Sequence, residues 1–105
     1  VRHEHDGEQF VLEIVRHFGD ERKPIASHCH GPQVLAAAGV LKGRRAMAYP
    51  ALEPDLAQCG CGWVKPGEGL TDAHTDGNLV TAAAWPAHPA LMRAFLELLG
   101  TPIAV

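Results

Sequence analysis

Long apolar runs are missing from this sequence, and so is any dense cluster of one charge. No stretch of the 105 residues approaches the apolar length that a membrane-spanning helix needs. The nine basic residues are scattered and the net charge is −3; only KGRR at 42–45 groups cations, and it is too short to follow a phosphate backbone. We therefore expect a soluble protein whose partners include neither membranes nor nucleic acids.

Cysteine is scarce as well. The three cysteines are an odd number, and no signal-peptide pattern precedes them. This argues against a disulfide framework and favours free thiols in a reducing, cytoplasmic compartment. Cys59 and Cys61 form a C-x-C pair, but zinc sites usually have C-x-x-C or wider spacing and four ligands. We interpret the pair as two small thiols at a helix end, with a metal module as the alternative, and expect no metal and no cofactor.

An initiator methionine is absent, and VRHEHDGEQF leads almost at once into a helical pattern. We expect the sequence to be part of a longer chain. Its 105 residues suffice for one small domain, since roughly 100 to 200 residues per domain is usual.

The apolar residues that are present follow alternating helix and strand patterns. Apolar positions at helical spacing, with Pro and Gly near the ends, predict helices over residues 6–18, 32–38, 52–60 and 89–99, the first with Asp6 as its N-cap. Short apolar runs predict strands over 24–27, 44–49, 62–65 and 79–83, the last after the turn signal Asp76-Gly77-Asn78. Strands that alternate with helices indicate an α/β fold with a mostly parallel sheet.

The stretch KPIASHCHGPQVL places Cys29 between two histidines where a strand gives way to a helix. A helix N-terminus favours a thiolate and can bind an oxyanion, and open α/β sheets bind ligands at this edge. His30 could pair with the thiolate or carry its proton. Alternatively, Cys29 is a small buried hydrophobic residue, and the residues alone leave both interpretations open. His28 precedes the turn and, by strand alternation, is expected to be packed or half-exposed rather than a second base.

The segment 23–60, KPIASHCHGPQVLAAAGVLKGRRAMAYPALEPDLAQCG, resembles the DJ-1/PfpI family, in particular its PfpI-like intracellular protease branch. The similarity continues through DGNLVTAAAWPAHPALMRAFLELLG and covers nearly the whole chain from about Val11. The resemblance implies a flavodoxin-like α/β sandwich related to class I glutamine amidotransferases. Residues 1–105 are then the C-terminal portion of a single domain without its N-terminal strands.

The resemblance also implies roles for individual residues. Cys29 matches the family's nucleophile at the strand-to-helix elbow, and His30 matches the adjacent histidine, the general acid and base. We also expect Gly31 and Pro32 to contribute to substrate binding, because they begin a helix whose N-terminus gives electrostatic support. Tyr49 and Trp85 line the rim of the pocket as substrate contacts; the alternative for both is simple packing.

Family members have been assigned as cysteine peptidases, as deglycases or glyoxalases acting on dicarbonyl adducts, and as oxidative-stress proteins. We therefore expect a cysteine hydrolase that acts on a small carbonyl or peptide substrate and forms a homo-oligomer. The alternative is a redox-sensing or chaperone-like stress protein that uses the same oxidisable cysteine.

The sequence departs from the family pattern in two places. The N-terminal part, with its acidic residue beside the cysteine and its Gly-Gly turn, is not within the sequence; Glu4 and Glu8 do not match the spacing of the branch's glutamate. At 82–86, AAAWP replaces an Arg-Gly-Pro-like loop, which puts substrate contacts near Trp85 in question.

Overall fold

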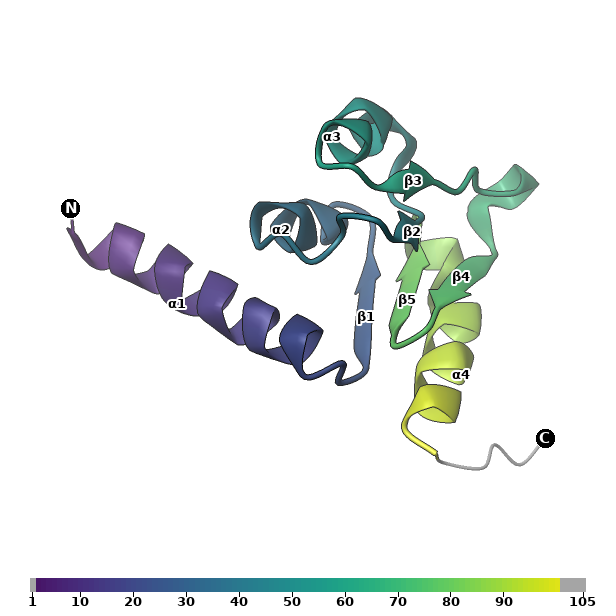
Figure 1. Ribbon diagram of the computed structural model, residues 1–105. Helices are drawn as coiled ribbons and strands as arrows, with labels where there is room; N and C mark the ends of the chain where they lie inside the picture. Colours follow the sequence, from purple (N-terminus) through teal and green to yellow (C-terminus); the bar gives the residue numbers. More distant parts are fainter. Residues whose placement is uncertain (1, 101–105) are drawn as a thin grey trace.

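The computed structural model describes the backbone of residues 2–100 and the side chains of residues 9–100. The side chains of Glu4 and Glu8 therefore lie outside the described residues. In chain order the elements are α1 (Arg2–Asp20), β1 (Ile25–His28), α2 (Pro32–Ala37), β2 (Arg45–Ala46), the 3-10 helix η1 (Pro50–Leu52), α3 (Glu53–Gln58), β3 (Gly62–Trp63), η2 (Glu68–Leu70), β4 (Ala73–Asp76), β5 (Leu79–Ala82), η3 (Trp85–Ala87) and α4 (His88–Leu98) (Figure 1).

The strands form a three-stranded sheet in the order β1-β5-β4 and a separate pair, β2 with β3. β1 runs parallel to β5, with His28 opposite Ala82 at its end, and β2 runs parallel to β3. β4 and β5 are antiparallel and form a hairpin. Two of the three strand pairings are thus parallel, and the expected α/β class with a mostly parallel sheet is confirmed.

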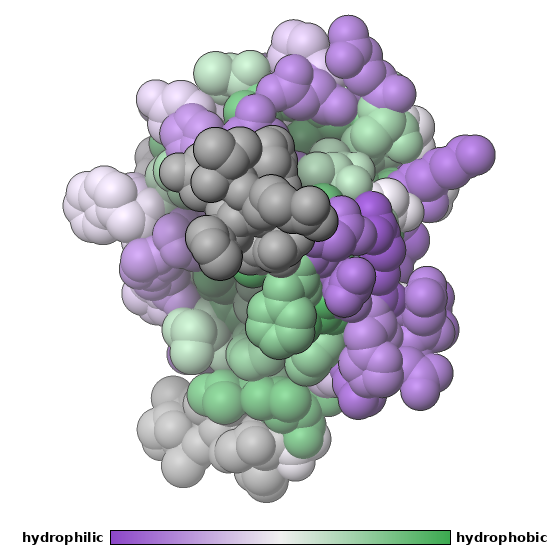
Figure 2. Space-filling model, turned by 90° about the vertical axis from the view of Figure 1, so that its left-hand side faces the viewer, coloured by the Kyte–Doolittle hydropathy of each residue, from purple (hydrophilic) through white to green (hydrophobic). Residues whose placement is uncertain are grey.

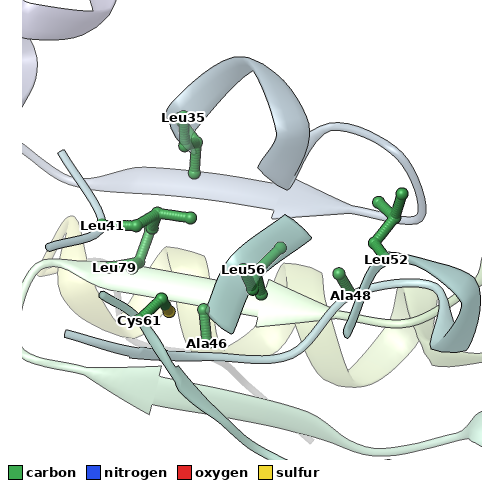
Figure 3. Close-up of a cluster of buried hydrophobic side chains, with 8 residues drawn as sticks. All are labelled: Leu35, Leu41, Ala46, Ala48, Leu52, Leu56, Cys61 and Leu79. Atoms are coloured by element: carbon green, nitrogen blue, oxygen red, sulfur yellow. The ribbon is translucent and has the colours of Figure 1, made fainter. Parts of the chain in front are cut away.

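The central strand β5 is buried on both faces, and its side chains alternate between two apolar clusters. Leu79 joins the larger cluster with residues of α2, α3 and the β2–β3 pair (Figure 3). Val80 and Ala82 point the other way and pack with Ala87, at the end of η3, and with Leu91 of α4. The buried hydroxyl of Thr81 accepts a hydrogen bond of 2.8 Å from the Met47 N–H, which ties the segment after β2 to the sheet.

The first helix packs only partly against the rest of the fold. α1 extends outward from the sheet (Figure 1), and Phe10, Val11, Ile14 and Phe18 are exposed on it. Figure 2, which faces this side of the molecule, shows hydrophobic surface between hydrophilic areas. An open cavity of about 490 Å³ lies between α1 and α2, lined by Val11, Leu12, Gln33, Val34 and Ala37. No helix within the described residues is both long and apolar enough to cross a membrane.

The structure corrects several sequence-based predictions. Asp6 is not an N-cap, because α1 already begins at Arg2. The strands expected over 44–49 and 62–65 shorten to two residues each, since they pair only with one another. Residues 73–76 form the unpredicted strand β4, whose pairing with β5 depends on the intervening turn. There Gly77 has a φ of 58°, as type II′ hairpins require at their first central position.

Candidate active site

The strand-to-helix junction after β1 holds Cys29 in a left-handed backbone conformation, with φ of 57°. Such a conformation is unfavourable for a non-glycine residue and persists only where its surroundings hold it. The Cys29 N–H donates to the Ala82 carbonyl (3.1 Å), and the Cys29 carbonyl accepts from the Tyr49 N–H (2.9 Å). The peptide groups on both sides of the cysteine are thus fixed by β5 and by the segment after β2.

The next residues make the bend sharp. A Cβ at Gly31 would lie 2.5 Å from the Ser27 Oγ and 3.0 Å from the His28 carbonyl oxygen, so a side chain would not fit here. The Gly31 N–H donates to that same carbonyl at 2.8 Å. Pro32 is buried and begins α2, where its missing N–H costs nothing. Gly31 and Pro32 therefore shape the elbow that presents Cys29.

At this elbow the Cys29 Sγ lies 3.2 Å from the Nδ1 of His30. Cys29 is half-buried and His30 is exposed. A thiol in contact with an imidazole is the arrangement in which a base activates a nucleophile. The structure thus brings together the two residues that the sequence singled out as catalytic candidates.

The imidazole of His30 is stacked on the ring of Tyr49. Their ring centroids are 5.1 Å apart and their planes differ by 23°. Tyr49 is 40% exposed, so the edge of its ring can meet a ligand while its face restricts His30. The Tyr49 N–H also donates to the Cys29 carbonyl, so the backbone holds Tyr49 beside both Cys29 and His30.

The backbone offers one donor at the elbow. Within the described part of the chain, the N–H of His30 donates no hydrogen bond, whereas that of Cys29 is used by β5. Pro32 has no N–H to contribute. The His30 N–H is therefore the group that can donate to an oxyanion formed near the Cys29 sulfur.

Trp85 is at the same edge of the sheet, since it begins η3 shortly after β5. Its side chain is 76% exposed. Its place at the rim of a substrate pocket stays a prediction.

The structure also brings together two histidines that sequence reasoning did not connect. The Nε2 atoms of His28 and His88 are 3.3 Å apart, and the rings meet edge to face. The contact arises because β1 and β5 are parallel neighbours, so His28 at the end of β1 meets the start of α4. His28 is half-buried, as the strand alternation predicted, and its Nδ1 is buried without a hydrogen-bond partner among the described residues.

The C-x-C pair belongs to the core and not to the elbow. Cys61 is a member of the larger apolar cluster (Figure 3). Cys59 packs against that cluster. Burial, followed by the proximity of Cys59, raises the pKa of the Cys61 thiol. The Cys59 thiol donates to the Leu56 carbonyl at 3.1 Å. No group of three or more potential metal ligands occurs among the side chains that the structure describes.

A carboxylate partner for the elbow is missing from the described residues. The one salt bridge found there joins Arg44 to Asp76, at the far edge of the sheet. The cavity between α1 and α2 is not lined by Cys29 or His30. The described residues thus supply a thiol, an imidazole, a stacked ring and a backbone donor, but no acid.

Comparisons with known proteins agree on one family. The model of the DJ-1/PfpI family matches residues 2–98. Protein DJ-1 homolog D of Arabidopsis thaliana is 48% identical over 96 residues, which are 91% of this chain and 24% of that protein. Deglycase PfpI of Pyrococcus furiosus is 39% identical over 93 residues, 85% of this chain and 51% of the relative. The chain thus spans about half the length of that deglycase and about a quarter of the Arabidopsis protein.

Solved structures show the same fold. Drosophila melanogaster DJ-1beta superposes with a TM-score of 0.71 at 25% identity, over 91% of this chain and 53% of that one. A two-domain protein from Anabaena variabilis, with DJ-1/ThiJ/PfpI-like and ferritin-like domains, gives a TM-score of 0.76 at 28% identity, over 86% and 24% of the two chains.

Proposed function

Since the chain belongs to the DJ-1/PfpI family, we propose that it supplies the nucleophile of a cysteine-dependent hydrolase, in which Cys29 attacks a carbonyl carbon. One observation carries the proposal: the Cys29 Sγ lies 3.2 Å from the His30 Nδ1 at a left-handed backbone position that the fold holds in place. Relatives named deglycases support hydrolysis as the reaction class.

The reaction needs only one proton carrier. The sulfur forms a bond to the carbonyl carbon while the π electrons of the C=O bond move to oxygen. The thiol proton passes to the Nδ1 of His30 and, with an amide substrate, is then delivered to the leaving group as its bond to carbon breaks. Methylglyoxal has no leaving group. Its hemithioacetal becomes a thioester when His30 takes a proton from the carbon that carries the sulfur and a proton is returned to the neighbouring carbon, so that the ketone becomes an alcohol as the aldehyde carbon becomes the thioester. Water adds to the resulting thioester, and the thiol is released with its proton restored.

The other residues of the elbow bind and orient the substrate. The His30 N–H donates to the developing oxyanion, and Gly31 and Pro32 keep the backbone close enough for this contact. Tyr49 restricts the imidazole by stacking and, with Trp85, contacts the part of the substrate beyond the carbonyl. A small carbonyl compound or a peptide fits this arrangement.

The missing acid and the exposed side of α1 support a further element of the proposal. Residues 1–105 form the C-terminal portion of one domain, and the other half of that domain covers α1 and supplies a carboxylate to the elbow. The coverage of about half of the Pyrococcus deglycases is consistent with this division. Assembly as a homo-oligomer and a reducing, cytoplasmic location, which suits three free thiols, belong to the same proposal.

A redox function is the second candidate, because the half-buried Cys29 thiol is open to small oxidants beside His30. Two molecules of hydrogen peroxide would convert the thiol to a sulfinic acid, each giving up one oxygen atom and leaving as water. Mass spectrometry after mild peroxide treatment tests this: two oxygens gained at Cys29, with a linked change in function, favour the redox role.

Turnover of methylglyoxal and of a peptide-coumarin amide by the full-length protein tests the hydrolase. Cys29→Ser is expected to lower kcat/KM by at least about 100-fold, because serine is a far weaker nucleophile beside the same imidazole. His30→Gln is expected to lower kcat by about 100-fold or more, the usual contribution of a general acid and base.

The matched control is Cys59→Ser, which changes a second partly buried thiol away from the elbow. Its kcat/KM should equal that of the unchanged protein. Retention of full turnover by Cys29→Ser with both substrates overturns the proposal.

A further inference from the structure

A cavity of about 340 Å³ lies at the edge of the sheet opposite to Cys29. Its walls come from the end of α1, the segment after α2 and the start of the segment that leads to β2. The turn between β4 and β5 adjoins it, so it is placed at the amino ends of β1 and β5, the lower edge of the sheet in Figure 1. The elbow lies at their carboxyl ends.

Four of the nine basic residues of the chain line this cavity: Arg16, Arg22, Lys42 and Arg44. Asp20 is the carboxylate among its lining residues. The cavity lining is therefore positively charged, although the chain as a whole has a net charge of −3.

Two of these cations have structural partners. The Arg44 guanidinium bonds to the Asp76 carboxylate at 3.3 Å and to the Asn78 Oδ1 at 2.9 Å, and so fastens the β4–β5 hairpin. The Arg16 Nε donates to the Ala38 carbonyl at 3.2 Å, where a cation offsets the negative end of α2. The fold accounts for both side chains.

Arg22 and Lys42 differ from the other two. Neither side chain makes an ion pair or hydrogen bond with any residue between 9 and 100. The Arg22 Nη2 lies 3.2 Å, and the Arg44 Nη2 3.5 Å, from the point that a Cβ on Gly77 would occupy. Two guanidinium groups therefore converge over the same glycine, although like charges repel. Arg22 keeps its donors free for a bidentate acceptor, whereas the Nε and Nη2 of Arg44 already donate to Asp76 and Asn78.

The backbone of Arg22 is in an unfavourable conformation for arginine. It has a φ of 53°, in the left-handed region that favours glycine after a helix end. Glycine would suit this position better, and arginine here places a guanidinium over the cavity at a cost in backbone energy.

We propose that this cavity binds the phosphate group of a small phosphorylated molecule, held by Arg22 and Lys42 with Arg44 as the fixed third cation. A planar guanidinium matches phosphate oxygens in pairs, and a lysine adds a point charge. The volume is at the lower end of small-molecule sites. The inference goes beyond the proposed hydrolase and does not depend on it, because the site shares no residue with the elbow.

Calorimetric titration of the full chain tests the site, with inorganic phosphate, glycerol 3-phosphate and tripolyphosphate as probes at constant ionic strength. The tightest probe identifies the source of the phosphate: a free ion, an ester or a polyphosphate. At least one is expected to bind with Kd below about 1 mM. Arg22→Gly should weaken that probe about tenfold or more while keeping the chain folded, because glycine relieves the left-handed strain.

Two controls separate the site from general charge effects and from the elbow. Lys65→Gln removes one positive charge outside this cavity and should change Kd by less than about twofold. Cys29→Ser should bind the probe like the unchanged chain, so loss of hydrolysis and loss of phosphate binding are read separately. The proposal is wrong if no probe binds with Kd below about 1 mM, or if Arg22→Gly and Lys65→Gln weaken binding equally.

Discussion

Cys29 and Gly31 define the elbow at the scale of single residues. Cys29 takes a positive φ and pays for it in backbone energy, while Gly31 leaves the space that the bend needs beside Ser27. The backbone conformation at position 29 is unfavourable for a cysteine, whereas the crowding at position 31 requires a glycine.

Gly31→Ala is expected to destabilise the protein by about 1 to 3 kcal/mol, because its Cβ would lie 2.5 Å from the Ser27 Oγ. Urea unfolding measures this, and turnover should fall with it as the elbow shifts. Ser27→Ala in the same chain should restore part of the stability. Gly67→Ala is the control, since a Cβ there meets Asp72 at an ordinary 3.4 Å; an equal loss in both variants would contradict the argument.

Cys61 carries a second residue-scale prediction. Burial raises the pKa of its thiol, so the folded protein keeps the proton at a pH where the unfolded chain has released it. The stability that this contributes is complete below the ordinary thiol pKa of about 8.5 and is lost as pH rises toward the folded value. Unfolding free energies from pH 7.5 to 10 should fall less steeply in Cys61→Ala than in the unchanged protein; identical slopes would refute the cause.

The β4–β5 hairpin shows how one charged contact sets the relation between elements. The Asp76 carboxylate accepts from the Arg45 N–H at 2.7 Å and pairs with the Arg44 guanidinium, which joins the hairpin to the start of β2. The hydrogen bond from the Arg45 N–H, with the Arg44 charge in addition, lowers the pKa of this carboxyl. One of these two contacts comes from a backbone N–H, which every residue except proline has, so the sequence alone does not reveal it.

Asp76→Asn is expected to cost up to about 1 kcal/mol at pH 7, a value reduced by the partial exposure of the pair. A lowered carboxyl pKa gives stability that is present above the unfolded value of about 3.9 and is lost as pH falls through the folded value. The gap between variant and unchanged protein in urea unfolding should therefore narrow as pH falls below about 3.9. Glu13→Gln is the control, because Glu13 is exposed on α1 and makes no hydrogen bond or ion pair with the described side chains.

At the scale of the whole molecule, the exposed side of α1 is the feature that the described fold leaves without a partner. Phe10 is 62% exposed and Ile14 44%, and Val34 of α2 faces the neighbouring cavity at 41%. β1 pairs on one edge only among the described strands, so the sheet too is open on this side. Exposed apolar area of this kind marks an interaction surface.

The 105-residue chain by itself is expected to associate through this side. Sedimentation velocity at increasing concentration should show oligomers, and Phe10→Glu with Ile14→Glu should shift the population to monomer. Met92→Glu is the matched control, because Met92 is 51% exposed but lies on α4. Equal dissociation by the α4 variant, or a monomer at all concentrations, would contradict the assignment to α1.

The amino-acid sequence by itself determined the α/β class, the order of the helices and the main strands, and the elbow at Cys29, because periodicity and Pro and Gly positions act over a few neighbouring residues. Tertiary structure alone decided the rest. β4, the stacking of His30 on Tyr49, the contact of His28 with His88 and the cations above Gly77 all join residues that are distant in the chain. Local sequence patterns do not predict such contacts, because strand pairing and side-chain packing determine which distant segments lie together.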